Sequence, residues 1–254
     1  MPESLIRFHN VRKAFGPLVV LDGMNLSIER GMVTTIIGKS GVGKSVLLKH
    51  LVGLLAPDSG EILIEGKALS AMSRAELREF RRKVSYMFQN MALFDSMTVY
   101  QNIALPLEER TKLSRSQIQD DVMERIAALD LGNIAQRYPS QISGGMKKRV
   151  ALARALITRP EVILFDEPTT GLDPIRKKHV HQMIAQYQQK FGFTAVIVSH
   201  DIPEVFEISQ RVALLDQGRI LFEGSSAEVM ASGDARVQQF ISGEEDEGAS
   251  PLEA

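Results

Sequence analysis

A glycine-rich stretch, GKSGVGKS at 38–45, limits the folds open to this chain more than any other feature. It follows the β-branched run VTTIIG (33–38) and leads into SVLLKHLVGLL (45–55), which has the apolar spacing of a helix. The stretch matches the P-loop pattern G-x-x-x-x-G-K-[ST], in which backbone N–H groups surround phosphates. The strand before it and the helix after it favour this interpretation over a plain glycine turn.

The residues of this loop predict separate roles in holding a nucleotide. Glycines let the backbone curl towards the phosphates, Lys44 would reach the β and γ oxygens, and the Ser45 hydroxyl would bind Mg²⁺. Phe15, in KAFG, either stacks on adenine or is an ordinary core aromatic. The predicted nucleotide-binding residues are Gly38, Lys39, Ser40, Gly41, Val42, Gly43, Lys44, Ser45 and Phe15.

Four further polar residues fall at the ends of predicted strands. The run VILFDE (162–167) predicts a buried strand, after which Asp166 would hold Mg²⁺ and Glu167 would polarise the attacking water. Gln89 suits a sensor of Mg²⁺ and water, and His200 suits a γ-phosphate contact. Each of these residues taken alone has an ordinary structural interpretation, and it is the P-loop upstream that favours the catalytic one.

A second helix start of the phosphate-binding kind lies far downstream, at ISGGMKKRV (142–150). A serine and two glycines run into a predicted helix at 144–157, which leaves bare N–H groups at its positive end. The basic run at 147–149 favours a solvated helix face over a nucleic-acid contact. The chain therefore carries two phosphate-binding ends but only one complete nucleotide pocket.

The order of predicted elements indicates an α/β fold with a mostly parallel sheet, because buried strands alternate with helices. Residues 5–28 alternate apolar and polar side chains and predict antiparallel strands with one buried face. Residues 98–157 look like a largely helical addition to the core. In such sheets the chemistry lies at the carboxyl ends of the strands.

Composition excludes several classes of protein. Hydrophobic residues make up 44% of the 254 residues, which excludes a disordered chain, and the formal net charge of −1 argues against a basic surface for nucleic acid. The absence of cysteine excludes disulfides and thiolate metal sites. The start of the chain is not expected to be a secretory signal. No run approaches the roughly 18 to 20 apolar residues of a membrane span, so another chain would cross any membrane.

The motifs in their order (GKSGVGKS, Gln89, ISGGM, VILFDE, GLDP and His200) resemble the ATP-binding subunits of ABC transporters. The resemblance covers nearly the whole chain, from about Ile6 to Ile241. It implies a P-loop ATPase core with a mostly parallel sheet, an N-terminal antiparallel β subdomain and a helical subdomain at about 90–160. It places the ATPase domain at 5–242. The acidic composition of the residues beyond it predicts a disordered tail at 243–254. The implied ligands are ATP and Mg²⁺, the latter held by Ser45, Gln89 and Asp166.

The same resemblance implies that two copies pair head to tail, so that each ATP lies between one P-loop and the partner's signature helix. The residues that would face the partner's ATP are Ser143, Gly144, Gly145 and Met146. Asp173 would lie at the dimer contact. Such a site is complete only in the closed dimer, which ties hydrolysis to closing and opening.

Met146 departs from the commonest signature, LSGGQ, because a thioether cannot replace the hydrogen bonds of an amide. With SGGMKKRVALARAL, GLDPI and GDARVQQFISG (233–243), the chain is similar to Mla-type phospholipid transporter ATPases. This implies a permease, an MCE lipid-binding protein and a small STAS-domain protein as partners, at the cytoplasmic face of a Gram-negative inner membrane. The implied role is phospholipid transport that maintains outer-membrane lipid asymmetry. Val237, Phe240 and Ile241 would form an apolar anchor.

Other functions remain open on the sequence alone. An ATPase that serves a methionine or lipoprotein transporter would share most motifs, but Met146 and the DARVQQF stretch argue against it. A DNA-repair or chromosome ATPase would carry a coiled-coil or zinc insert, whereas 46–142 has neither sustained heptads nor cysteine. A binding module with a dead site would leave an intact catalytic set unused. The stretch MALFDSM (91–97) predicts either a docking groove or plain core.

Overall fold

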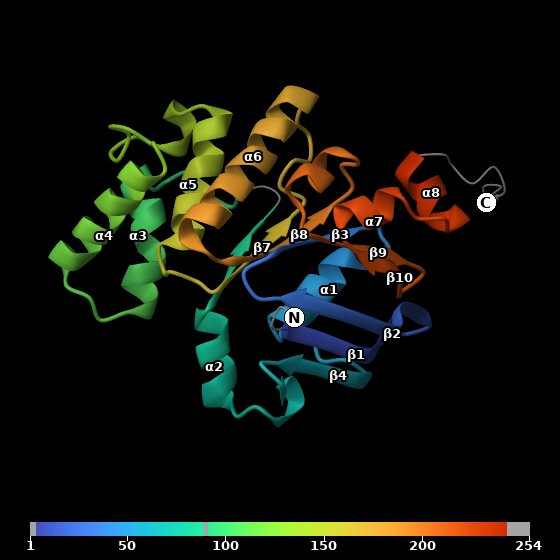
Figure 1. Cartoon of the computed structure of the whole chain (residues 1–254). Coiled ribbons are helices and arrows are strands. Elements are labelled where there is room, and N and C mark those ends of the chain that lie inside the picture. The colour runs from blue at the N-terminus through green and yellow to red at the C-terminus, as the bar shows by residue number, and fades with distance from the viewer. Residues whose placement is uncertain (1–3, 89–90, 243–254) are drawn as a thin grey trace.

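The computed structural model describes residues 4–88 and 91–242, which form two β-sheets and a group of helices (Figure 1). The smaller sheet is antiparallel, with the order β2-β1-β4-β5. In its first strand Ile6 and Phe8 are buried and Arg7 is exposed, which confirms the alternation predicted at 5–28. Its strands are β1 (Ser4–Phe15), β2 (Leu18–Glu29), β4 (Ser59–Ile64) and β5 (Lys67–Ala68).

The larger sheet has the order β10-β9-β3-β8-β7-β6. All its neighbouring strands pair in parallel except β10, which runs antiparallel to β9. The predicted α/β fold with a mostly parallel sheet is therefore confirmed. Its strands are β3 (Val33–Ile37), β6 (Val84–Met87), β7 (Val162–Asp166), β8 (Thr194–Ser199), β9 (Arg211–Asp216) and β10 (Arg219–Gly224).

The central strands send alternate side chains into two separate cores. In β7, Ile163 and Phe165 join the core that includes α3 and α5, whereas Leu164 joins the core that includes α1 and the small sheet. Both faces of the parallel sheet are therefore covered, which explains the unbroken apolar runs in the sequence. It also places α1 and α5 on opposite faces of this sheet.

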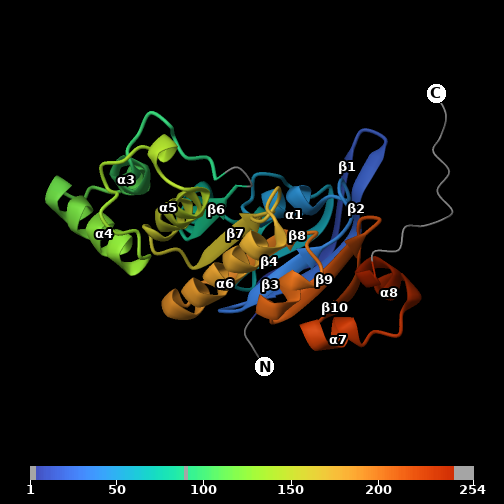
Figure 2. The same ribbon diagram turned by 90° about the horizontal axis from the view of Figure 1, so that it is seen from above.

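Helices α3, α4 and α5 gather at one end of the molecule (Figures 1 and 2). Ser114 caps the second of these helices, since its hydroxyl accepts a hydrogen bond from the Gln117 N–H at 3.3 Å. The helices are α1 (Lys44–Leu51), α2 (Arg74–Arg82), α3 (Val99–Arg110), α4 (Arg115–Ala128), α5 (Gly144–Leu156), α6 (Pro174–Phe191), α7 (Ser226–Met230) and α8 (Ala235–Ser242). Short 3-10 turns lie at Leu69–Ala71, Pro139–Gln141 and Glu204–Ile208.

The last helix, α8, packs on the chain's own core. Val237 is buried, and Phe240 and Ile241 lie partly buried against the same cluster. The tail predicted at 243–254 lies outside the described residues. Within the described ranges, no helix is both long and apolar enough to cross a membrane.

Candidate nucleotide-binding site

The P-loop connects the end of β3 to the start of α1, as the sequence predicts. Two of its glycines are required by close packing. A Cβ atom on Gly38 would lie 2.4 Å from the Leu215 carbonyl oxygen, and one on Gly43 would lie 2.6 Å from a methyl group of Val20. Gly43 also has a φ of 110°, which side chains disfavour. The chain's own fold therefore requires these glycines, and it holds the β1–β2 hairpin beside the loop.

Lys44 lies at the centre of this loop. Its ammonium donates hydrogen bonds to the carbonyl oxygens of Gly38 at 2.7 Å and Lys39 at 2.9 Å, and it lies 3.9 Å from Glu167 Oε1. The residue is only 5% exposed. Burial lowers the pKa of Lys44, and the charges of Glu167 and Asp166 act in the opposite direction. The loop thus holds a buried cation in the place where the motif requires one for phosphate binding.

Ser45 and Asp166 bring together two oxygen ligands of the kind that Mg²⁺ prefers. Ser45 Oγ lies 3.4 Å from Asp166 Oδ1, and the Tyr86 hydroxyl donates to Asp166 Oδ2 at 2.7 Å. Mg²⁺ commonly binds through one or two carboxylates together with substrate phosphates, and this pair fits that pattern. Gln89, the third predicted ligand, lies outside the described residues.

Tyr86 is a site residue that the sequence analysis missed. It lies in β6, directly beside Leu164 of β7, so its hydroxyl reaches the end of the neighbouring strand. Burial and the bond to Asp166 raise the pKa of Tyr86, so the phenol keeps the proton that it donates. The predicted strand VSYMFQ contains Ser85 and Gln89 as well, so no pattern in the sequence singled out Tyr86.

Glu167 follows β7 directly and has a φ of 48°, a left-handed conformation that a non-glycine residue rarely adopts. Its Oε2 accepts a hydrogen bond from the Thr170 hydroxyl at 2.9 Å and lies 3.5 Å from His200 Nδ1. Backbone conformations of this kind cluster at functional sites. Lys44, Glu167 and His200, which are widely separated in the chain, therefore lie together as predicted.

Phe15 is 47% exposed, so the alternative that it is a core aromatic is wrong. It ends β1, and the Lys13 ammonium lies 5.6 Å from the centre of its ring. An exposed ring on the hairpin beside the P-loop is consistent with adenine stacking, which stays a prediction.

The second helix start, at α5, differs from the P-loop. Ser143 caps the helix, because its Oγ accepts from the Met146 N–H at 3.3 Å. A Cβ atom on Gly144 or Gly145 would meet no described atom within 4 Å, and neither glycine has a positive φ. Met146 is 38% exposed. Nothing in the subunit's own packing therefore requires these glycines, although glycine inside a helix is about 0.5–1 kcal/mol less stable than alanine.

Asp173 lies in the exposed turn that opens α6. Its carboxylate accepts a hydrogen bond from the Arg176 N–H at 3.1 Å and lies 3.2 Å from the Arg176 guanidinium. The neighbouring Ile175 is 71% exposed. Asp173 therefore has a structural role as a helix cap, and its place beside an exposed isoleucine is consistent with the predicted dimer contact.

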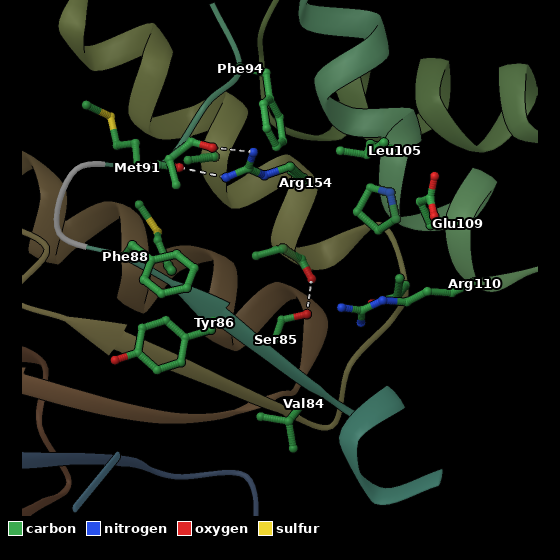
Figure 3. A pocket seen from close by; sticks show the side chains of 16 residues that line it. Val84, Ser85, Tyr86, Phe88, Met91, Phe94, Leu105, Glu109, Arg110 and Arg154 are labelled. Carbon is green, nitrogen blue, oxygen red and sulfur yellow. Dashed lines mark hydrogen bonds between the residues drawn. The ribbon is translucent and has the colours of Figure 1, made fainter. Parts of the chain in front are cut away.

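A separate pocket of about 450 Å³ lies between β6, the segment after it, α3 and α5 (Figure 3). Phe88 and Phe94 line it and are 52% and 49% exposed. Arg154 donates to the carbonyl oxygens of Met91 at 2.6 Å and Ala92 at 2.8 Å, which holds this edge of the pocket in shape (Figure 3). Met91 and Phe94 of the MALFDSM stretch line this pocket, while Met91 and Leu93 also pack against the core. The stretch therefore has features of both alternatives, and docking stays a prediction.

Comparison with known proteins agrees with this geometry. A family model described as ABC transporter matches residues 21–170. The chain belongs to the ABC transporter family. The MlaF proteins, described as intermembrane phospholipid transport system ATP-binding proteins, align over almost all of it. The Escherichia coli K12 protein is 40% identical over 94% of this chain and 89% of its own length. The Haemophilus influenzae protein is 38% identical over 97% and 93%.

Solved structures of ABC transporter ATPases share the fold. cbiO1 of Clostridium perfringens, part of the cbiONQ transporter complex, superposes with a TM-score of 0.83 at 30% identity, covering 93% of this chain and 94% of its own. The dimeric bacterial ABC transporter cassette MJ0796 gives 0.74 at 31% identity, covering 87% and 98%. A second MJ0796 structure is a dimer in a post-hydrolysis state with ADP and phosphate. This chain is therefore an ABC transporter ATPase.

Proposed function

We propose that this ATPase works as a head-to-tail pair of identical subunits, which closes on ATP and thereby powers phospholipid transport. The observation that carries the paired arrangement is the contrast between its glycines. A Cβ atom added to Gly144 or Gly145 would meet open space within the subunit itself. Their lack of a side chain is explained if a molecule outside the subunit, the ATP of the partner, approaches the start of α5.

Within one subunit, the P-loop and the strand ends divide the chemistry between them. Lys44 binds the β- and γ-phosphates, while Ser45 and Asp166 would hold Mg²⁺, with the Asp166 carboxylate oriented by its bond from Tyr86. When bound, Mg²⁺ neutralises charge on the phosphate oxygens. Gln89 is proposed as a further metal and water contact.

Glu167 acts as the residue that orients the attacking water. Thr170 holds one of its carboxylate oxygens, so the side chain has a defined direction at the end of β7. His200, next to that oxygen, contacts the γ-phosphate. Phosphoryl transfer depends chiefly on positioning and charge stabilisation, which a fixed carboxylate and a nearby imidazole supply.

The proposed partners follow from the groove and the relatives. The pocket at Phe88 and Phe94 offers an apolar lining with an arginine-braced edge, which suits a cytoplasmic segment of a membrane permease. Similarity to MlaF, described as an intermembrane phospholipid transport system ATP-binding protein, supports phospholipid as the transported molecule. An MCE protein and a STAS-domain protein as further partners, and the cytoplasmic face of the inner membrane as the location, are proposed from the resemblance of the sequence motifs to Mla-type ATPases. A mycobacterial relative described as a probable ribonucleotide transport ATP-binding protein, 39% identical over 94% of this chain, favours a second candidate substrate.

The shared site is tested with mixed dimers that carry two defects, Lys44→Ala and Ser143→Ala. In the combined dimer one copy carries both defects, and if the signature acts on the partner's ATP, both ATP sites are then disabled. In the divided dimer each copy carries one defect, so both defects fall on the same ATP site and the other site stays active. Each dimer is isolated through two different affinity tags, and its ATP turnover is measured. Ser140→Ala, an exposed serine just before α5, replaces Ser143→Ala in the control dimers. Activity in the combined dimer but not in the divided one would reject the arrangement.

The transported molecule is tested by isolating the tagged chain from its native membranes and identifying bound proteins and lipids by mass spectrometry. A permease with an MCE protein and phospholipid is the expected result. A permease of another kind would retain the ATPase mechanism and reject phospholipid transport.

A further inference from the structure

A cluster of buried polar side chains lies behind the catalytic loop. It comprises the buried residues Lys148 of α5, Thr169 after β7, His181 of α6 and Asp201 after β8, together with Lys177 of α6, whose side chain is 25% exposed. We call these five residues the buried polar cluster. Their four segments also carry the signature start, Glu167, Asp173 and His200. The cluster therefore lies where the functional segments of one subunit meet.

Asp201 holds two of these segments together. Its carboxylate accepts hydrogen bonds from the Thr169 hydroxyl and from the Lys177 ammonium, and its own N–H donates to Ser199 Oγ at 3.0 Å. It is only 4% exposed. Burial raises the pKa of Asp201, but the bonds from Lys177 and Thr169 outweigh it, so the pKa lies below its ordinary value. Asp201 is therefore an ionised link between the segment after β8 and those that lead into α6.

Lys148 adds the signature helix to this network. Its ammonium donates to the carbonyl oxygen of Pro168 at 2.6 Å, and the residue is 8% exposed. Pro168 directly follows Glu167, so a side chain of α5 holds the backbone beside the catalytic carboxylate. Burial lowers the pKa of Lys148, and the charge of Asp201 acts against that shift.

The stability of the fold does not by itself explain why these positions are polar and charged. Apolar side chains of similar size at buried charged positions often give equal or greater stability. His181 emphasises this, because it is 2% exposed and neither ring nitrogen has a hydrogen-bond partner among the described residues. A buried lysine and a buried aspartate, with the half-buried Lys177 beside them, lie at the junction of four functional segments and are better explained by a role in positioning these segments.

We propose that Lys148 and Asp201 are positioning residues for hydrolysis. Lys148 ties the signature helix of a subunit to the loop that carries its own Glu167, and Asp201 fixes that loop through its bond from Thr169. On the head-to-tail arrangement proposed above, α5 contacts the partner's ATP while Glu167 acts on the subunit's own ATP. The contact of Lys148 with Pro168 then lets engagement of one site set the carboxylate of the other. The two sites of the dimer would hydrolyse ATP cooperatively for this reason.

The test compares Lys148→Met, Lys148→Arg and Asp201→Asn in the full chain, with ATP affinity, turnover and the Hill coefficient measured for each. Because a small misplacement of a reacting group lowers rates steeply, we expect Lys148→Met to lower kcat about tenfold or more. Its ATP affinity should stay within about twofold, because Lys44 and the P-loop are unchanged. Its Hill coefficient should fall from above 1 towards 1. Asp201→Asn should act in the same direction.

Two further variants separate positioning from mere packing. Lys148→Arg keeps a buried donor for Pro168 and should restore most of the turnover. Lys178→Met removes an exposed lysine of α6, paired at 3.6 Å with Glu207, and should leave all three measurements unchanged. Wild-type turnover and cooperativity in both Lys148→Met and Asp201→Asn would overturn the proposal while the ATPase function stands. Loss of ATP affinity together with thermal stability in Lys148→Met, without rescue by Lys148→Arg, would reduce the cluster to a packing role. An inactive wild-type chain would instead count against the proposed function.

Discussion

Two helices of this ATPase begin with glycines that suit phosphate binding, but the glycines are there for different reasons. In the P-loop, the Leu215 backbone and the Val20 side chain leave no room for a Cβ atom at Gly38 and Gly43. At the start of α5, Gly144 and Gly145 have open space around them. The first pair is required by the fold of the subunit, and the second pair is not. The comparison teaches that glycines at a phosphate-binding helix start, when the subunit's own packing does not need them, point to a ligand supplied from outside.

The side chains around the two helix starts also differ in burial and charge. The P-loop encloses a buried cation, Lys44, with Glu167 3.9 Å away, so a catalytic set already surrounds it. The start of α5 presents the exposed residues Ser143 and Met146. The P-loop therefore belongs to a site with catalytic side chains, whereas the start of α5 provides only groups that can bind a ligand.

The largest effect is expected from Glu167→Gln, which keeps the shape of the side chain and removes its charge. Turnover should fall roughly a hundredfold or more because water positioning is lost, while ATP affinity stays near wild type. Glu61→Gln, at an exposed position of β4, is the control and should change neither quantity. Normal turnover in Glu167→Gln would show that another residue orients the water, and would contradict the assignment of the catalytic groups to the P-loop side of the comparison.

Lys44→Ala should weaken ATP binding itself. The loss of a charged hydrogen-bond donor to phosphate corresponds to roughly 1.5–3 kcal/mol, or about 10- to 100-fold in affinity. The measurement is ATP binding by titration calorimetry. Lys49→Ala removes an exposed lysine of the same helix and should leave the affinity unchanged. Equal affinity of Lys44→Ala and Lys49→Ala for ATP would contradict the role of the P-loop.

Alanine at the two kinds of glycine should separate stability from turnover. Gly38→Ala should lower the free energy of unfolding by about 1–3 kcal/mol, because its Cβ atom meets backbone. Gly144→Ala should leave that free energy unchanged or raise it by up to about 1 kcal/mol, while dimer turnover falls. Urea denaturation and ATP turnover measure the two effects. A Gly144→Ala protein as unstable as Gly38→Ala would show that the fold requires both glycines.

The smallest effect concerns Asp201 and acid. Its pKa is lower in the fold than its ordinary value of 3.8, so the ionised form stabilises the fold above that pH. This stabilisation disappears as the pH falls below 3.8 through the lowered pKa. The urea midpoint of the wild type should therefore drop more steeply between pH 5 and 3 than that of Asp201→Asn. Asp120→Asn, an exposed position of α4, should keep the wild-type pH dependence, and parallel curves for all three proteins would contradict the assignment.

Local patterns were enough to predict much of the site. The β-branched run before Gly38 and the helix after Ser45 mark the P-loop, and the apolar run before Asp166 marks a strand end. Such features depend on residues within one or two turns of chain, which is why the strand and helix positions agree with the structure. The exposure of Phe15 was not predictable in this way, because it depends on where the hairpin packs.

Contacts between distant segments were not predictable. Tyr86 reaches Asp166 across 80 positions, and Lys148 reaches Pro168 across 20, with no periodic signal to connect them. The first contact follows from the order of the parallel sheet, in which β6 and β7 are neighbours although helices α3, α4 and α5 separate them in the chain. The second follows from the packing of α5 against the same sheet.

The sequence by itself determined the α/β fold, the P-loop, the carboxylates after β7 and the second helix start, because the spacing of glycines and apolar residues sets each of them locally. The tertiary structure alone decided which glycines the subunit needs for its own packing and which stand open. It also decided that Tyr86 orients Asp166 and that Lys148 supports the loop of Glu167. The physical reason is that steric contact and burial depend on strand order and layer packing, which bring together side chains that the sequence keeps far apart.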